Sequence, residues 1–473
     1  MRNFNETWLT VVATSLMASC AHAPIVSDPG EPAGSPSRGV VTPLSSQLLN
    51  KKRLIVVFVH GVGDTCPGYA IESQDPLLKR KSLEFMGLFP GADKTVLKGN
   101  IPVQDFVAGH RKDDKSHVTY RVLHYELRRP NLPGLPTDIV EITWSQLTQW
   151  LKTNRLGFDV TTPTPAVGSI EDDCPYTTSA VYKPPPSREK VNRLLKEGIL
   201  DRNLTDAVIY SGRYGRIIRR GVADALCLAP GGTQVPGGVL CHWPSPLDEN
   251  VRVIFVTHSL GSRIVYDTLF GLTGQPLYKG ESTFGEDDTA EGKLFLNRLL
   301  ADTSAVYMMA NQLPLVGLAF EDGSSTSDDA PKPTLTQDLQ LGSELRANAS
   351  SESAAVATLS ATKSLVGIAQ IRSRALAEFG QAPESLHVVA FSDTNDLLTW
   401  GVPKWYDSSA GGAPFDLQIT NVYVQTSFHF PFIEWPTWAH RQYFDKKSVW
   451  RVIWCGTDAP GHVARCPGSG TTH

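Results

Sequence analysis

The sequence predicts an α/β protein, with a mostly parallel central sheet flanked by helices and with long insertions between its elements. Four continuous apolar runs, rich in β-branched residues, have the composition of strands that are buried on both faces. They lie at residues 54–59, 251–256, 386–391 and 418–424. Weaker strand patterns lie at residues 117–125, 139–144 and 305–310. Helical spacing of apolar residues at 262–270, 363–379 and 446–454 alternates with these strands, which favours parallel pairing.

The overall composition is that of a globular protein and gives no sign of a nucleic-acid partner. The chain has 473 residues, of which 41% are hydrophobic and 19% charged, and its formal net charge is -4. This length is enough for one large domain or about three small ones. Because the balance of charge is slightly acidic, there is no electrostatic reason to expect binding to a phosphate backbone.

The N-terminal residues indicate export from the cytoplasm. Arg2 precedes an apolar stretch at residues 8–17, which is too short to cross a bilayer and is typical of a signal peptide. The stretch ends in Leu-Met-Ala-Ser-Cys, and this sequence resembles the lipobox of bacterial lipoproteins. The resemblance implies that residues 1–20 are a signal peptide with a lipobox and that Cys20 is lipidated. An ordinary Ala-x-Ala cleavage site at residues 21–23 is the alternative.

The two interpretations differ in where the exported protein remains. The first predicts a membrane-anchored lipoprotein of a bacterial cell envelope, in the periplasm or outer membrane, and the second a secreted or periplasmic protein. Residues 21–47 are expected to be a flexible tether, because most of this segment is rich in Pro, Gly and Ser. The folded domain is expected at residues 48–473, with insertions at about 150–245 and 271–380.

The cysteines are consistent with an oxidising compartment. Seven cysteines less the lipobox cysteine leave six, which suggests up to three disulfide bonds. One arrangement closes two short loops and one long one: Cys227 with Cys241, Cys455 with Cys466, and Cys66 with Cys174. Other pairings, or buried free thiols, stay open. No Cys or His spacing in the sequence indicates a metal site, so no metal is expected.

A candidate nucleophile follows the second strong strand. The sequence Thr-His-Ser-Leu-Gly places Ser259 between a buried strand and a helix, where a tight turn would hold the hydroxyl exposed to a substrate. The backbone N–H of Leu260 would then stabilise an oxyanion. This segment resembles the Gly-x-Ser-x-Gly nucleophile elbow of α/β-hydrolases, with His258 and Gly261 as supporting residues of the turn. It departs from that pattern at Thr257, which stands in place of the first glycine.

The first strong strand ends in His-Gly-Val-Gly. In many α/β-hydrolases an HG segment after an early strand supplies the second oxyanion N–H, and that resemblance implies Val62 as the donor. Gly61 and Gly63 would let the backbone approach the substrate, with His60 supporting the turn. The alternative is a simple glycine turn with a structural histidine.

The remaining members of a catalytic triad follow the third and fourth strong strands. An acid after residue 391 would orient an imidazole and stabilise its protonated form. Asp396, which precedes two apolar residues, is favoured over Asp393, which is expected to brace the loop. His440 precedes aromatic residues and a closing helix, as the histidine of the family does, whereas its rival His429 lies in an aromatic run.

The order Ser259, Asp396, His440 along the chain is that of α/β-hydrolases. The resemblance covers roughly residues 54–455 and implies the α/β-hydrolase fold. It also implies a serine hydrolase that cleaves carboxylic esters, of small molecules or lipids, through an acyl-enzyme intermediate. No metal or organic cofactor and no nucleic acid would take part. The aromatic segment at residues 428–438 is interpreted as an apolar acyl pocket or as packing of a proline-rich loop.

Two other function classes remain open at this stage. The first is a non-catalytic binding lipoprotein on a hydrolase scaffold, which would have no reason to keep all three triad residue types. The second is an acyltransferase that uses the same serine and passes the acyl group to an acceptor other than water.

Overall fold

A computed structural model describes the protein over most of its central sheet and the helices around it. The described residues are 25–27, 40–44, 53–63, 65, 67–70, 95–103, 120–127, 137–145, 148, 151–152, 189, 192, 195–212, 214–228, 233–235, 238–240, 251–272, 290–317, 365–403, 417–426, 436–458 and 463–464.

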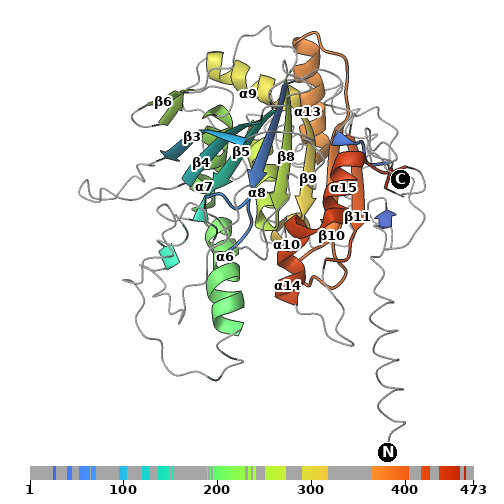
Figure 1. The fold of residues 1–473 in the computed structure, drawn as a ribbon. Coiled ribbons are helices and arrows are strands. Elements are labelled where there is room, and N and C mark those ends of the chain that lie inside the picture. The colour runs from blue at the N-terminus through green and yellow to red at the C-terminus, as the bar shows by residue number, and fades with distance from the viewer. Residues whose placement is uncertain are drawn as a thin grey trace, which may run out of the picture.

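A nine-stranded sheet forms the centre of the fold, in the order β1-β11-β10-β9-β8-β2-β5-β4-β3 (Figure 1). Its strands are β1 (Ile25–Ser27), β2 (Arg53–Val59), β3 (Thr95–Val103), β4 (Tyr120–Leu127), β5 (Thr137–Thr143), β8 (Val251–His258), β9 (Thr303–Met309), β10 (Leu386–Ser392) and β11 (Leu417–Tyr423). From β11 across to β5 all neighbours pair in parallel, and β1, β4 and β3 add antiparallel pairs at the two edges. The prediction of a mostly parallel sheet is confirmed.

Helices flank this sheet. Those on the first face are α7 (Gly215–Leu228), α8 (Leu260–Leu272), α9 (Ala290–Asp302) and α13 (Leu365–Glu378). The second face is covered by α15 (Lys447–Cys455) and the short 3-10 helix η10 (Tyr443–Asp445). The other described elements are the π-helical segment η5 (Lys196–Leu204), α6 (Thr205–Ser211), α10 (Leu313–Gly317), α14 (Pro436–Arg441) and the separate hairpin of β6 (Thr233–Val235) and β7 (Gly238–Leu240).

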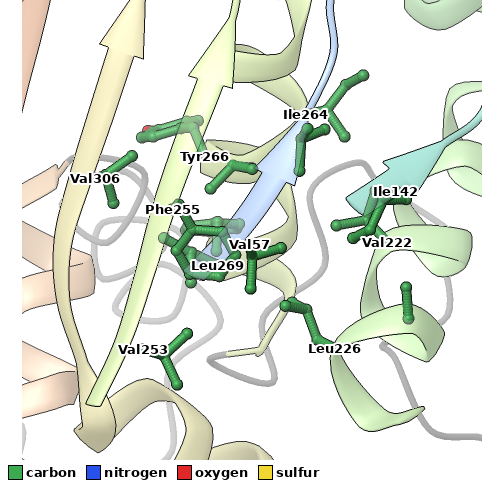
Figure 2. Packing of buried hydrophobic residues seen from close by; sticks show 14 of the residues in the cluster. Val57, Ile142, Val222, Leu226, Val253, Phe255, Ile264, Tyr266, Leu269 and Val306 are labelled. Atoms are coloured by element: carbon green, nitrogen blue, oxygen red, sulfur yellow. The ribbon is translucent and has the colours of Figure 1, made fainter. Parts of the chain in front are cut away.

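Alternate residues of each central strand enter two cores on opposite faces of the sheet. In β2, for example, Val57 packs in the core under α8 and Phe58 in the core under α15. Figure 2 shows the first of these cores, where Val57 and Phe255 of the sheet face Leu269 of α8. Strands of this kind are apolar at most positions, because a strand with helices on both faces has no solvent side.

The order of the strands creates a switch point between β2 and β8. From β2 the chain crosses to β3 at one edge of the sheet and returns through β4 to β5, whereas from β8 it continues through β9 and β10 to β11 on the other side. Connections that leave two adjacent parallel strands in opposite directions open a crevice at their carboxyl ends, where α/β proteins bind ligands. The fold therefore directs attention to the residues that follow Val59 and His258.

The predicted elements agree with the observed ones, except in segments whose structure depends on pairing at an edge of the sheet or on tertiary packing. All seven predicted strands exist, within a few residues of their expected bounds. The edge strands β1 and β3 were not predicted, because β1 has only three residues and the sequence of β3 contains Gly, Pro and Lys.

Parts of the segments expected to be a tether or insertions pack against the sheet. Within the expected tether, residues 25–27 pair with β11. Val41 is buried; its N–H donates to the Thr457 hydroxyl, and its carbonyl accepts from the Thr457 N–H. Within the expected insertions, β9 is a central strand of the sheet and α7 packs in the main core. These segments bury apolar residues that the sequence pattern alone did not assign to a partner.

Several other expectations lie outside the described residues. These include the signal peptide, Cys20, the cysteines other than Cys227 and Cys455, His429 and residues 428–435 of the aromatic segment. Cys227 and Cys455 are each disulfide-bonded, but no disulfide joins two residues of the described part, so the pairing stays a prediction. Among the described helices, none is both long and apolar enough to span a bilayer.

Candidate active site

Ser259 lies in the tight turn between β8 and α8. Its φ angle is 54°, in the left-handed region that residues other than glycine rarely adopt. The Ser259 N–H donates to the Met309 carbonyl at 2.8 Å, and the Ser262 hydroxyl donates to the Ser259 carbonyl at 2.8 Å. These bonds occupy the backbone groups of the strained residue, so the turn is held while the serine side chain keeps its own partner.

The two residues before Ser259 fit this turn in different ways. Thr257 is buried, and its hydroxyl donates to the Tyr307 carbonyl of neighbouring β9 at 3.3 Å. A threonine is therefore accommodated where the nucleophile elbow has glycine, because its side chain finds an acceptor on the next strand. His258 donates from Nε2 to the His440 carbonyl at 2.7 Å, which ties the turn to the segment that carries the candidate base.

His440 and Asp396 complete a continuous chain of hydrogen bonds that begins at Ser259. His440 Nε2 lies 2.8 Å from Ser259 Oγ, and His440 Nδ1 lies 2.9 Å and 3.1 Å from the two oxygens of Asp396. All three side chains are buried. Because an ionised carboxylate only accepts, Nδ1 carries the proton, which leaves Nε2 to accept from the serine hydroxyl. This arrangement can take up the serine proton.

The structure brings Asp396, and not Asp393, to the imidazole of His440. Asp393 instead accepts from the Thr426 N–H at 2.5 Å and from the Asn395 N–H at 2.9 Å. The Thr426 hydroxyl also lies 2.7 Å from the Asp393 carboxylate. One aspartate thus braces the loop after β10 and the other orients the imidazole, as the sequence predicts.

Tyr443 links the two aspartates and is a residue that the sequence did not single out. Its hydroxyl accepts from the Asp393 N–H at 2.6 Å and donates to Asp396 Oδ2 at 3.2 Å. Burial, reinforced by the two carboxylates, raises the pKa of Tyr443 well above its ordinary value, so the hydroxyl keeps its proton. Its position three residues after His440, at the start of the 3-10 helix that follows α14, is the signal that could have identified it.

The turn after β2 lies directly against the nucleophile. A Cβ on Gly61 would lie 2.4 Å from the Cβ of Ser259, and a Cβ on Gly261 would lie 2.4 Å from the Val59 carbonyl oxygen. Real side chains do not approach this closely, so both positions require glycine. The absence of these two side chains is what lets the end of β2 touch the start of α8.

Both predicted oxyanion donors belong to this contact. Val62 follows Gly61, and Leu260 follows Ser259 as the first residue of α8. The N–H groups of a first helical turn have no acceptor within their helix and lie at the positive end of the helix dipole. An oxyanion that forms beside Ser259 would meet this favourable end of α8.

His60 supports the turn as a neutral, buried imidazole. The Trp144 N–H donates to His60 Nε2 at 3.0 Å, so Nδ1 carries the proton and donates to the Gly61 carbonyl at 2.7 Å. The ring stacks on Trp144 with a centroid separation of 4.7 Å. Burial lowers the pKa of His60 to about 3; the Gly61 bond opposes this shift and the Lys152 charge adds to it. His60 is therefore a structural support and not a second base.

Metal ligands are not evident at this site. No group of three or more His, Cys, Asp or Glu residues with the arrangement of a metal site occurs within the described part of the chain.

Replacing His60 should change how stability depends on pH. Its pKa is about 3 in the folded protein against an ordinary 6.5, so the unfolded chain binds the extra proton between these values. The contribution of the neutral imidazole to the free energy of unfolding is therefore complete above pH 6.5. It decreases as the pH falls, by up to about 1.4 kcal/mol per pH unit. In His60→Asn the amide can still donate to Gly61 but does not titrate. Urea unfolding from pH 7 to pH 4 should show the wild-type advantage shrinking; parallel curves would contradict this.

Comparison with known proteins offers no relative from which a function could be transferred. No protein-family model, no curated protein and no solved structure matches this chain. What the site does is therefore inferred from its own residues and their geometry.

Proposed function

We propose that this chain is a serine hydrolase of the α/β-hydrolase type that cleaves carboxylic esters. The observation that carries the proposal is the unbroken chain of buried hydrogen bonds from Ser259 through His440 to Asp396. Two further features support it: the triad follows the Ser-Asp-His order of α/β-hydrolases, and it lies at the carboxyl ends of parallel strands beside a switch point.

The first half of the proposed reaction acylates the serine. Ser259 Oγ attacks the ester carbonyl while His440 Nε2 takes the hydroxyl proton, and Asp396 stabilises the imidazolium through Nδ1. The N–H groups of Leu260 and Val62 stabilise the negative oxygen of the tetrahedral intermediate. His440 then gives its proton to the departing alkoxide, which leaves as an alcohol, and the acyl group stays on Ser259.

In the second half, water repeats the attack on the acyl-enzyme. His440 takes a proton from the water, and as the second tetrahedral intermediate collapses, it returns this proton to Ser259 Oγ, which releases the acid and free Ser259. No cofactor is required for either half. An acyltransferase would use the same first half, and would differ only in the acceptor that reaches the acyl-enzyme.

An apolar acyl group is the proposed substrate feature. Leu397 and Trp400 are 67% and 41% exposed, so the loop that carries Asp396 presents two large apolar side chains to solvent. A lipid ester fits such a surface, as does a small ester with an alkyl chain. A binding lipoprotein without activity is the competing hypothesis, and it leaves the complete triad unexplained.

Labelling with a fluorophosphonate probe tests the nucleophile. Wild-type protein should label at Ser259, and Ser259→Ala should abolish labelling because the attacking oxygen is gone. His440→Ala should slow it at least about 100-fold, because the general base is lost. Ser211→Ala, at an exposed serine on α6, is the matched control and should label like wild type. A folded wild type that fails to label with and without detergent would favour the binding lipoprotein.

The two aspartates should separate catalysis from stability. Asp396→Asn should lower kcat by about 10³- to 10⁴-fold, because the amide favours the wrong imidazole tautomer. Asp393→Asn should chiefly reduce the free energy of unfolding, by about 1–3 kcal/mol, because Thr426 loses its charged acceptor. Ester hydrolysis and urea unfolding of both variants provide the comparison, and the reverse ranking in kcat would reassign the acid to Asp393.

We also propose that the protein is exported and anchored to a membrane through a lipid on Cys20. Cys20→Ala should remove lipid labelling and release the protein from the membrane fraction, since a cysteine thiol is the attachment point. Membrane fractionation after growth with a labelled fatty acid measures both effects. A variant that stays in the membrane fraction would argue against the anchor.

A further inference from the structure

A fully buried ion pair lies next to the turn after β2 and has no role in the proposed reaction. The Lys152 ammonium lies 2.7 Å from Asp206 Oδ1, and both side chains have 0% exposure. The other oxygen of Asp206 accepts from the Gly63 N–H at 2.7 Å. A buried carboxylate thus reaches the turn that carries Val62, from a helix more than a hundred residues later in the chain.

Such a pair calls for an explanation other than stability. Removing two charges from water is costly, and buried ion pairs can often be replaced by apolar residues of similar size without loss of stability. Burial raises the pKa of Asp206, and the Lys152 charge acts against that shift. The ammonium therefore favours the ionised form of the carboxylate, which is the better acceptor for an N–H group.

The turn is held on both sides of Val62. His60 Nδ1 donates to the Gly61 carbonyl at 2.7 Å, and Asp206 accepts from Gly63. In a trans peptide the C=O and N–H point in opposite directions, so fixing the Gly61 carbonyl directs the Val62 N–H away from His60. Fixing the Gly63 N–H fixes the next peptide plane in the same way. Gly63 has a φ of 106°, so this conformation depends on glycine and on external support.

Helix α6 is itself anchored to the element that carries the other donor. Tyr210, one turn after Asp206 in α6, donates to Asp267 of α8 at 2.6 Å, and Arg263 of α8 lies 2.9 Å from the same carboxylate. Figure 1 shows α6 at the end of the sheet where α14 lies. Helix α6 therefore contacts the turn after β2 through Asp206 and, through Tyr210, the helix that begins at Leu260.

We propose that Asp206, paired with Lys152, is a positioning residue that holds Gly63 so that the Val62 N–H stays aimed at the developing oxyanion. This inference rests on the proposed function. Asp206 does not touch the substrate; it acts through the backbone of the turn. The helical region around α6 thereby supports the oxyanion hole through the turn after β2.

The test compares two double variants, of which only one keeps an acceptor oxygen at residue 206. Lys152→Met/Asp206→Asn removes the charges but keeps an oxygen for the Gly63 N–H. Lys152→Met/Asp206→Leu removes the charges and the acceptor together, with similar volume. With kcat expressed per active site titrated by fluorophosphonate, the leucine variant should fall about 10- to 100-fold below the asparagine variant, because a misplaced donor stabilises the transition state less. KM should differ by less than about twofold, since a bound ester has not yet developed the charge.

A second readout and a matched control separate positioning from general damage. An alkyl boronic acid, which forms a tetrahedral adduct on an active serine, should bind the leucine variant more weakly by the same factor as the loss in kcat. The control is a buried ion pair in α9, Arg298 with Asp302 at 2.8 Å. Arg298→Met/Asp302→Leu should change the urea midpoint but not kcat per active site.

The outcomes are distinct. Equal kcat and equal boronate affinity in the asparagine and leucine variants would overturn the positioning role while leaving the hydrolase intact. Wild-type protein that neither labels nor hydrolyses esters would overturn the proposed function and this inference with it. If the leucine variant does not fold, Lys152→Met/Asp206→Ala takes its place, since alanine also lacks the acceptor and imposes no bulk.

Discussion

The candidate site depends on one close contact, between the turn that ends β2 and the turn that ends β8. Gly61 lies where any side chain would collide with Ser259, and Gly261 lies where one would collide with the carbonyl of Val59. Because neither glycine has a side chain, the two turns can lie in direct contact beside the Ser259 hydroxyl. The left-handed conformation of Ser259 is the local cost of this approach, and its bond to Met309 on the next strand helps to hold it.

The sequence predicts the central sheet well because its strands are buried on both faces. Strands β2 and β8 each carry a nearly continuous apolar run rich in β-branched residues, which is the pattern of a strand buried on both faces. The edge strands give no comparable signal, since β3 contains Gly, Pro and Lys and depends on its pairing with β4. The expected tether fails at residues 25–27 for the same reason, because a three-residue strand gains its stability from the neighbour it joins. The pattern of apolar residues shows which side chains of a segment must be buried, but it does not show which other segment packs against them.

The site residues that follow a strand with a clear apolar pattern could be predicted, whereas those that depend on packing between distant segments could not. Ser259, Asp396 and His440 each follow a strand that the pattern identifies, so the parallel sheet was enough to bring them to one edge. Asp206 and Lys152 lie in a region without the apolar pattern of a strand, and the sequence around each of them does not indicate a buried charge. Their pairing is a property of the packed fold, because each becomes acceptable in the interior only through the other and through the Gly63 N–H.

The register of the sheet explains how such widely separated segments reach one point. Val59 lies opposite Thr257, and His258 opposite Met309, so β2, β8 and β9 end at nearly the same level. Strands β10 and β9 continue this alignment, with Phe391 opposite Met309. A slip of one residue in any of these pairs would turn each side chain to the other face of the sheet and misplace both cores, so core packing holds the register. The register of the sheet therefore sets where the segments after β2, β8 and β10 begin. His440 lies in α14, beyond the end of β11, and its bonds to Asp396 and His258 hold it beside Ser259.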